Sequence, residues 1–179
     1  MRMKRAVRGL IAAPLVLIGL LSAAPADAQR PHPPYDPGPN PAELPHGDYC
    51  DDFTAVVTFT ELNQYIVRST TASDGTVTLR IAGRARATVT NQMTGESVSF
   101  NISGPGTLVI NPDGSFSANL AGPNLLWTAR ANLANFPNVP TISYTTGHVT
   151  FGVDPSGQTT SYSLAGGSRQ TNVCTVLAP

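Results

Sequence analysis

The feature that most constrains the fold is an alternation of apolar and polar residues that begins after Asp51. It is clearest in five segments: 76–81, 84–90, 97–103, 115–120 and 148–153. A period of two is typical of a strand with one buried face and one wet face. No long apolar stripe at helical spacing occurs in this region, and 129–139 has room for one helical turn before Pro137 limits it. The sequence therefore predicts an all-β domain.

Turn motifs separate these segments. ASDGT (72–76), NPDGS (111–115) and DPSGQ (154–158) carry the Gly, Pro, Asn and Asp residues that tight turns require. We expect Asp74, Asp113 and Asp154 to accept hydrogen bonds from backbone amides within these turns instead of acting in catalysis. Turn spacing predicts about ten strands and a short last one. They lie near 53–60, 63–70, 76–82, 84–91, 96–103, 106–111, 114–120, 124–130, 141–153, 158–165 and 170–176.

Two architectures suit such a chain. Short sequential connections favour an antiparallel up-and-down β-barrel of about 8–11 strands, which removes exposed strand edges. A two-layer β-sandwich is the alternative. A barrel places its first and last strands side by side, and a sandwich with a terminal clasp explains the same sequence features.

Cys50 and Cys174 are the only cysteines, and they stand at the two edges of the predicted domain. In an exported chain, two cysteines most simply form one disulfide. Their Cα atoms must then approach to within roughly 7 Å. We therefore expect the start and the end of the domain to lie side by side.

The N-terminus has the layout of a secretory signal peptide. A basic start is followed by the apolar run 10–21 and by small residues ending at Ala28, after which cleavage is expected. An uncleaved anchor is the alternative, but the run is short and Pro14 interrupts it. Residues 1–28 are thus predicted to be removed from a secreted, extracellular protein. No later segment is long and apolar enough to span a membrane.

The mature chain is predicted to have two parts. Residues 29–47 are dense in proline and are expected to form a disordered tether in polyproline II geometry that neither pairs as a strand nor forms a helix. Residues 48–179 form the single all-β domain. Cleavage removes four of the 11 basic and one of the 11 acidic residues, which leaves a net charge near −3 and no lysine. This balance argues against a nucleic acid partner, which requires a basic face.

Two residues are candidates for a site. Trp127 is the lone tryptophan and is expected in the core or at the mouth of the barrel, where it would stack on a ligand. His148 is the only histidine of the predicted domain, and alternation points it away from Val149 and Phe151 toward solvent. No catalytic residue, metal site or cofactor is predicted, since GxSxG-like and phosphate-binding motifs are absent and the two cysteines form no metal-site pattern.

Three functions remain open. The first is a secreted, non-catalytic β-domain with a binding or structural role, whose partner is a cell-envelope component or a small apolar ligand. The second is a barrel that encloses a small lipophilic ligand near Trp127. The third is a hydrolase that uses His148 with a nearby acid.

The stretch VTNQMTGESVSFNISGPGT, together with AGPNLLW, TTGHVTFGVD and the closing VCTVL, resembles small secreted actinobacterial proteins with β-rich domains. The resemblance covers most of 50–177. It implies an extracellular β-rich domain with paired terminal cysteines, and it implies no activity and no site residues.

Overall fold

Residues 32–179 are described by the structure, a computed structural model, and they form antiparallel β-sheets almost throughout. The predicted signal peptide, residues 1–28, lies outside the described residues, as do residues 29–31. Within the described part of the chain, no helix has the length and hydrophobicity to cross a membrane. The all-β prediction is confirmed.

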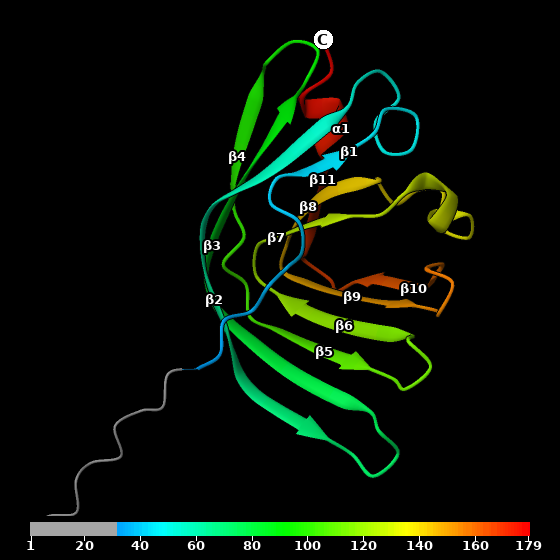
Figure 1. The fold of residues 1–179 in the computed structure, drawn as a ribbon. Coiled ribbons are helices and arrows are strands. Elements are labelled where there is room, and N and C mark those ends of the chain that lie inside the picture. The colour runs from blue at the N-terminus through cyan, green and yellow to red at the C-terminus, as the bar shows by residue number, and fades with distance from the viewer. Residues whose placement is uncertain (1–31) are drawn as a thin grey trace, which may run out of the picture. The chain divides into compact units, whose positions relative to one another are not determined.

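Eleven strands, one 3-10 turn and one short helix make up the described chain. In order they are β1 (Ala42–Leu44), β2 (Ala55–Thr71), β3 (Val77–Asn91), β4 (Ser97–Asn101), β5 (Gly106–Ile110), β6 (Phe116–Ala121), β7 (Asn124–Trp127), η1 (Arg130–Leu133), β8 (Ile142–Thr146), β9 (His148–Val153), β10 (Thr159–Leu164), β11 (Arg169–Asn172) and α1 (Val173–Val176). The eight-stranded sheet has the order β1-β2-β3-β5-β6-β9-β10, with β4 also paired to β3. The three-stranded sheet has the order β11-β8-β7 (Figure 1).

The predicted closed barrel is wrong, because the eight-stranded sheet is open. Its end strands β1 and β10 each have one neighbour and do not pair with each other. The long strand β3 divides its outer edge between two partners, since residues 77–81 pair with β5 and residues 86–90 pair with β4. The last strand, β11, joins β8 in the smaller sheet and does not return to β1. The edges formed by β1 and β10 therefore stay separate, whereas in a barrel the first and last strands would pair.

A corner joins the two sheets, because three stretches of chain pass from one to the other. β6 leads into β7, β8 leads into β9, and β10 leads into β11. At this corner the amide of Gly122 donates to the oxygen of Gly147 over 2.7 Å. Gly147 has φ +99°, and a Cβ there would lie 2.5 Å from the Oγ of Ser168. Only glycine suits that position, and the strand predicted over 141–153 therefore divides into β8 and β9.

The hydrophobic core fills the space between β1–β4 on one side and β7, β8 and α1 on the other. Ala85, Ala87 and Val89 are fully buried, as their alternation in β3 predicts. Val57 of β2 and Ile142 of β8 are fully buried as well. The core therefore lies between two antiparallel sheets that do not close into a barrel.

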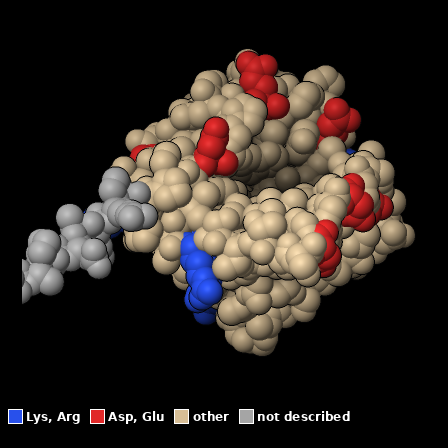
Figure 2. Space-filling model, turned by 60° about the horizontal axis from the view of Figure 1, so that its bottom comes forward, with Lys and Arg blue, Asp and Glu red and all other residues tan. Residues whose placement is uncertain are grey.

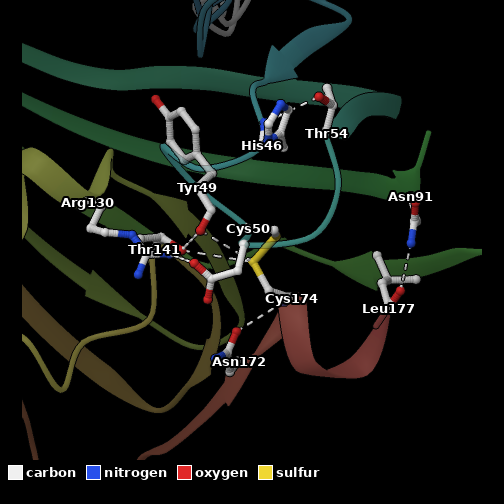
Figure 3. Close-up of a disulfide and its surroundings, with 11 residues drawn as sticks. His46, Tyr49, Cys50, Thr54, Asn91, Arg130, Thr141, Asn172, Cys174 and Leu177 are labelled. Carbon is white, nitrogen blue, oxygen red and sulfur yellow. Dashed lines mark hydrogen bonds and ion pairs between the residues drawn. A yellow bond between two sulfur atoms is a disulfide. The ribbon is translucent and has the colours of Figure 1, made fainter. Parts of the chain in front are cut away.

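The predicted disulfide between Cys50 and Cys174 is confirmed, with Cα atoms 5.4 Å apart. It links the loop after β1 to helix α1 (Figure 3). Beside it, Thr141 donates a side-chain hydrogen bond to the oxygen of Tyr49. Asn172 caps α1 by accepting a hydrogen bond from the amide of Cys174 over 3.0 Å. The start and the end of the domain are therefore held together by covalent and polar contacts.

Residues 32–47 of the proline-rich segment are not the predicted disordered tether. They lie along the edge of β2. Residues 42–44 are strand β1. Further toward the N-terminus, the oxygen of Pro33 accepts a hydrogen bond from Ile66, and the amide of Tyr35 donates to the oxygen of Gln64. Proline lacks an N–H but keeps its carbonyl, and the residues between the prolines keep both groups. A single edge can therefore be paired by a segment too rich in proline to occupy the middle of a sheet.

Candidate functional site

A cavity of about 410 Å³ lies between the inner face of the eight-stranded sheet and β7; we call it the Trp127 cavity. Its volume is within the range of small-molecule sites. Figure 2 shows a hollow in the molecular surface whose visible wall is uncharged, with acidic and basic side chains outside it. The corner between the two sheets holds the walls of the cavity apart.

Alternation along β5 and β6 builds one wall of this cavity. Every second residue of the two strands faces inward: Gly106, Leu108, Ile110, Phe116, Ala118 and Leu120. Gly106 pairs with Leu120 across the strands, and a Cβ on Gly106 would lie 2.7 Å from the Leu120 side chain. The glycine thus leaves room for the leucine that reaches over it.

Aromatic and aliphatic side chains from other strands complete the lining. Phe151 of β9 meets Phe116 edge-on, with ring centroids 6.1 Å apart. Trp127 closes the opposite side, where its ring is tilted over Phe59 at a centroid distance of 6.2 Å. Leu126 lies next to Trp127 on β7. Trp127 therefore lines an apolar cavity between two sheets and not the predicted mouth of a barrel.

Part of the lining is only partly buried, whereas Phe59, Ile102 and Leu125 belong to the core. Leu108, Ile110, Phe116, Leu120 and Phe151 all have intermediate exposure. Each square ångström of apolar surface left in water forgoes about 25 cal/mol of stabilisation. Small-molecule sites are commonly concave and lined by apolar and aromatic side chains with a few polar groups, which is the character of this cavity.

The cavity lining contains no acidic or basic side chain. Its polar members are Tyr35, Gln64 and Asn124. Burial raises the pKa of Tyr35, and the neighbouring Asp36 raises it further, so the phenol stays neutral. The site therefore offers apolar contact and neutral hydrogen bonding.

His148 lies away from this lining, at the exposed start of β9. Its Nε2 is 2.6 Å from the side-chain oxygen of Asn119. Ser168 holds the His148 backbone by donating to its oxygen and accepting from its amide. Among residues 32–179, no carboxylate forms a salt bridge or hydrogen bond with His148. The structure thus brings together neither His148 and Trp127 nor the histidine–acid pair that a hydrolase would require.

The predicted structural roles of the turn acids are confirmed. Asp74, Asp113 and Asp154 each accept a hydrogen bond from the backbone amide two residues later, at 2.9 Å. Hydrogen bonds from Thr76, Ser115 and Ser156 lower the pKa of the respective carboxyl groups. Asp51, one of two adjacent acids, forms an ion pair with Arg130. Within the described range, no three His, Cys, Asp or Glu side chains are placed to hold a metal ion.

Comparison of the chain with protein-family models, with curated proteins and with solved structures gives no significant match. The resemblance to secreted actinobacterial proteins therefore stays a prediction. Inferences about function depend on the geometry of the cavity.

Proposed function

We propose that this protein is a non-catalytic binding domain that takes up a small apolar molecule in the Trp127 cavity. The observation that carries the proposal is the uncharged, mostly apolar lining, partly exposed along β5, β6 and β9, around a volume of about 410 Å³. A ligand that filled the cavity would remove this surface from water. Each methylene group buried in this way would stabilise the complex by about 0.8 kcal/mol. Of the three functions considered from the sequence, this one unites the first and the second, without the closed barrel.

The hydrolase hypothesis receives no support from the surroundings of His148. The side chain is exposed, and its hydrogen-bond partner is an amide. An amide oxygen orients an imidazole but does not stabilise its charged form as a carboxylate does. If an activity were found, His148→Ala should leave it unchanged.

Export is part of the same proposal. The basic, apolar and small N-terminal residues and the Cys50–Cys174 disulfide both suit an oxidising compartment. Intact-mass measurement of the protein recovered from culture medium should give a chain that starts at Gln29. Recovery of the uncleaved chain from the cell would contradict export.

Binding is tested with N-phenyl-1-naphthylamine, an uncharged dye whose fluorescence rises in an apolar site. Leu108→Asn places an amide in the cavity wall and should weaken dye binding about tenfold or more. Val109→Asn is the matched control, because Val109 is the next residue of β5 and does not line the cavity. Equal dye affinity of the two variants, or no saturable binding by the wild type, would overturn the proposal.

A further inference from the structure

Behind Trp127 lies a second, smaller cavity of about 190 Å³. Four side chains line both spaces: Phe116, Leu126, Trp127 and Phe151. The two cavities are therefore neighbours that share these four residues as a partition. All four are only partly buried, so their side chains are not held on every side by the core.

The second cavity has a different chemical character, since hydroxyl groups gather in it. They belong to Thr128, Thr141, Ser143, Thr159 and Tyr162. Ser143 and Thr159 are 1% and 4% exposed, so these two hydroxyls are withheld from bulk water. Tyr162 accepts a hydrogen bond from Gln170 over 2.6 Å and keeps its own O–H to donate. Because burial raises the pKa of Tyr162, this donor stays protonated.

Neither cavity has a charged side chain in its lining. A carboxylate, phosphate or ammonium group taken into either space would lose its hydration without gaining an opposite charge. A hydroxyl, ether, ester or amide group would lose less, because the hydroxyls of Ser143, Thr159 and Tyr162 would replace its contacts with water. The hydroxyl of Thr141 already donates to Tyr49.

We infer, on the basis of the proposed function, that the ligand is a neutral amphiphile. Its hydrocarbon chain lies in the Trp127 cavity, and its uncharged polar end lies past the four-residue partition among the hydroxyls of the second cavity. Selection between lipophilic molecules then depends on the charge of the polar end as well as on chain length.

The test compares three ten-carbon compounds as competitors of N-phenyl-1-naphthylamine at pH 8: 1-decanol, decanoate and decyltrimethylammonium. We expect decanol to displace the dye at a concentration at least tenfold lower than either ion. Dye binding with equal displacement by decanol and decanoate would overturn the neutral-ligand inference and leave the proposed function standing. Absence of dye binding would overturn both.

The position of the polar end is tested with Thr159→Val, which removes one buried hydroxyl and nearly keeps the side-chain shape. It should weaken decanol binding by about tenfold and leave dye binding unchanged. Thr160→Val is the matched control, since Thr160 is the exposed neighbour and lines neither cavity. Ser143→Ala provides a second variant if Thr159→Val lowers the melting temperature. If decanol affinity is unchanged in both cavity variants, the polar end does not lie in the second cavity.

Discussion

The side chain of Asn91 joins the end of β3 to the C-terminal segment, since its Nδ2 donates to the backbone oxygen of Leu177 over 2.9 Å (Figure 3). Its Oδ1 accepts hydrogen bonds from the amides of Met93 and Thr94 in the following turn. Asn91 is fully buried. One side-chain amide thus connects the β3–β4 hairpin to Leu177, at a sequence separation of 86.

Replacing this amide should be costly. Asn91→Ala leaves the buried oxygen of Leu177 without its partner, at about 1–3 kcal/mol, and removes the part-buried bond from the amide of Met93 as well. We expect the free energy of unfolding in urea to fall by about 2–4 kcal/mol. Asn101→Ala is the control, because Asn101 is exposed and accepts a single bond from Ser103. A loss for Asn91→Ala no larger than the loss for Asn101→Ala would show that the amide does not stabilise the fold.

The disulfide should contribute a large part of the stability. It closes a loop with a sequence separation of 124. Loop-closure entropy then gives about 5 kcal/mol, and typical native bridges give about 2–5 kcal/mol. Reduction should lower the melting temperature of the wild type by about 5–20 °C at this size. The double variant Cys50→Ala/Cys174→Ala should melt at the reduced temperature whether or not reductant is present, and an equal response of both proteins to reductant would contradict the assignment.

The corner between β8 and β9 should not tolerate a side chain at residue 147. Gly147→Ala combines a positive φ with a Cβ that lies 2.5 Å from the Oγ of Ser168. We expect a loss of more than about 1 kcal/mol in the free energy of unfolding. Gly166→Ala serves for comparison, since no atom lies within 4 Å of its added Cβ and its φ is not positive. Denaturation curves that coincide for the two variants would remove the argument that this corner requires glycine.

Acid should destabilise the fold partly through the turn aspartates. The pKa values of Asp74, Asp113 and Asp154 are lowered from their ordinary value of 3.8, so the folded state binds protons less readily than the unfolded state. Their contribution is present above pH 3.8 and is lost as the pH falls through the lower values of the folded state. The variant with all three changed to Asn keeps side-chain acceptors in the turns and should lose less stability than the wild type between pH 5 and pH 2.5. Parallel urea midpoints for the two proteins over this range would exclude the linkage.

Much of the fold follows from the residues, because alternation and turn chemistry are local. The inward faces of β3, β4 and β6 and the side-by-side cysteines are as predicted. The number of strands agrees, but their boundaries differ where long strands bend without ending. β2 continues through two bulges, between Phe59 and Glu61 and between Ile66 and Arg68, in place of the two predicted strands. A bulge adds one residue to one strand, and a single sequence does not distinguish it from a short turn.

The cavity was only partly predictable. Period two shows that Leu108, Phe116 and Phe151 face inward, but it does not show whether another layer fills the space in front of them. That depends on the corner at Gly147 and on which edge β11 joins, which are long-range choices. Asn91 was missed for the same reason, because a buried amide in a turn has the same local pattern as a surface one. The only hint of Asn91 in the sequence was its place in the stretch VTNQMTGE, which has the composition of a turn.

The position of Cys174 gives the disulfide a role in the order of assembly. β2 and β3 are neighbours in the chain and can pair as soon as both have emerged, whereas the sulfur of Cys50 has to wait for a residue made 124 positions later. A chain that stops before residue 174 would therefore carry a single reactive thiol on an otherwise sheet-forming polypeptide. Only a chain that reaches residue 174 can therefore form the Cys50–Cys174 disulfide.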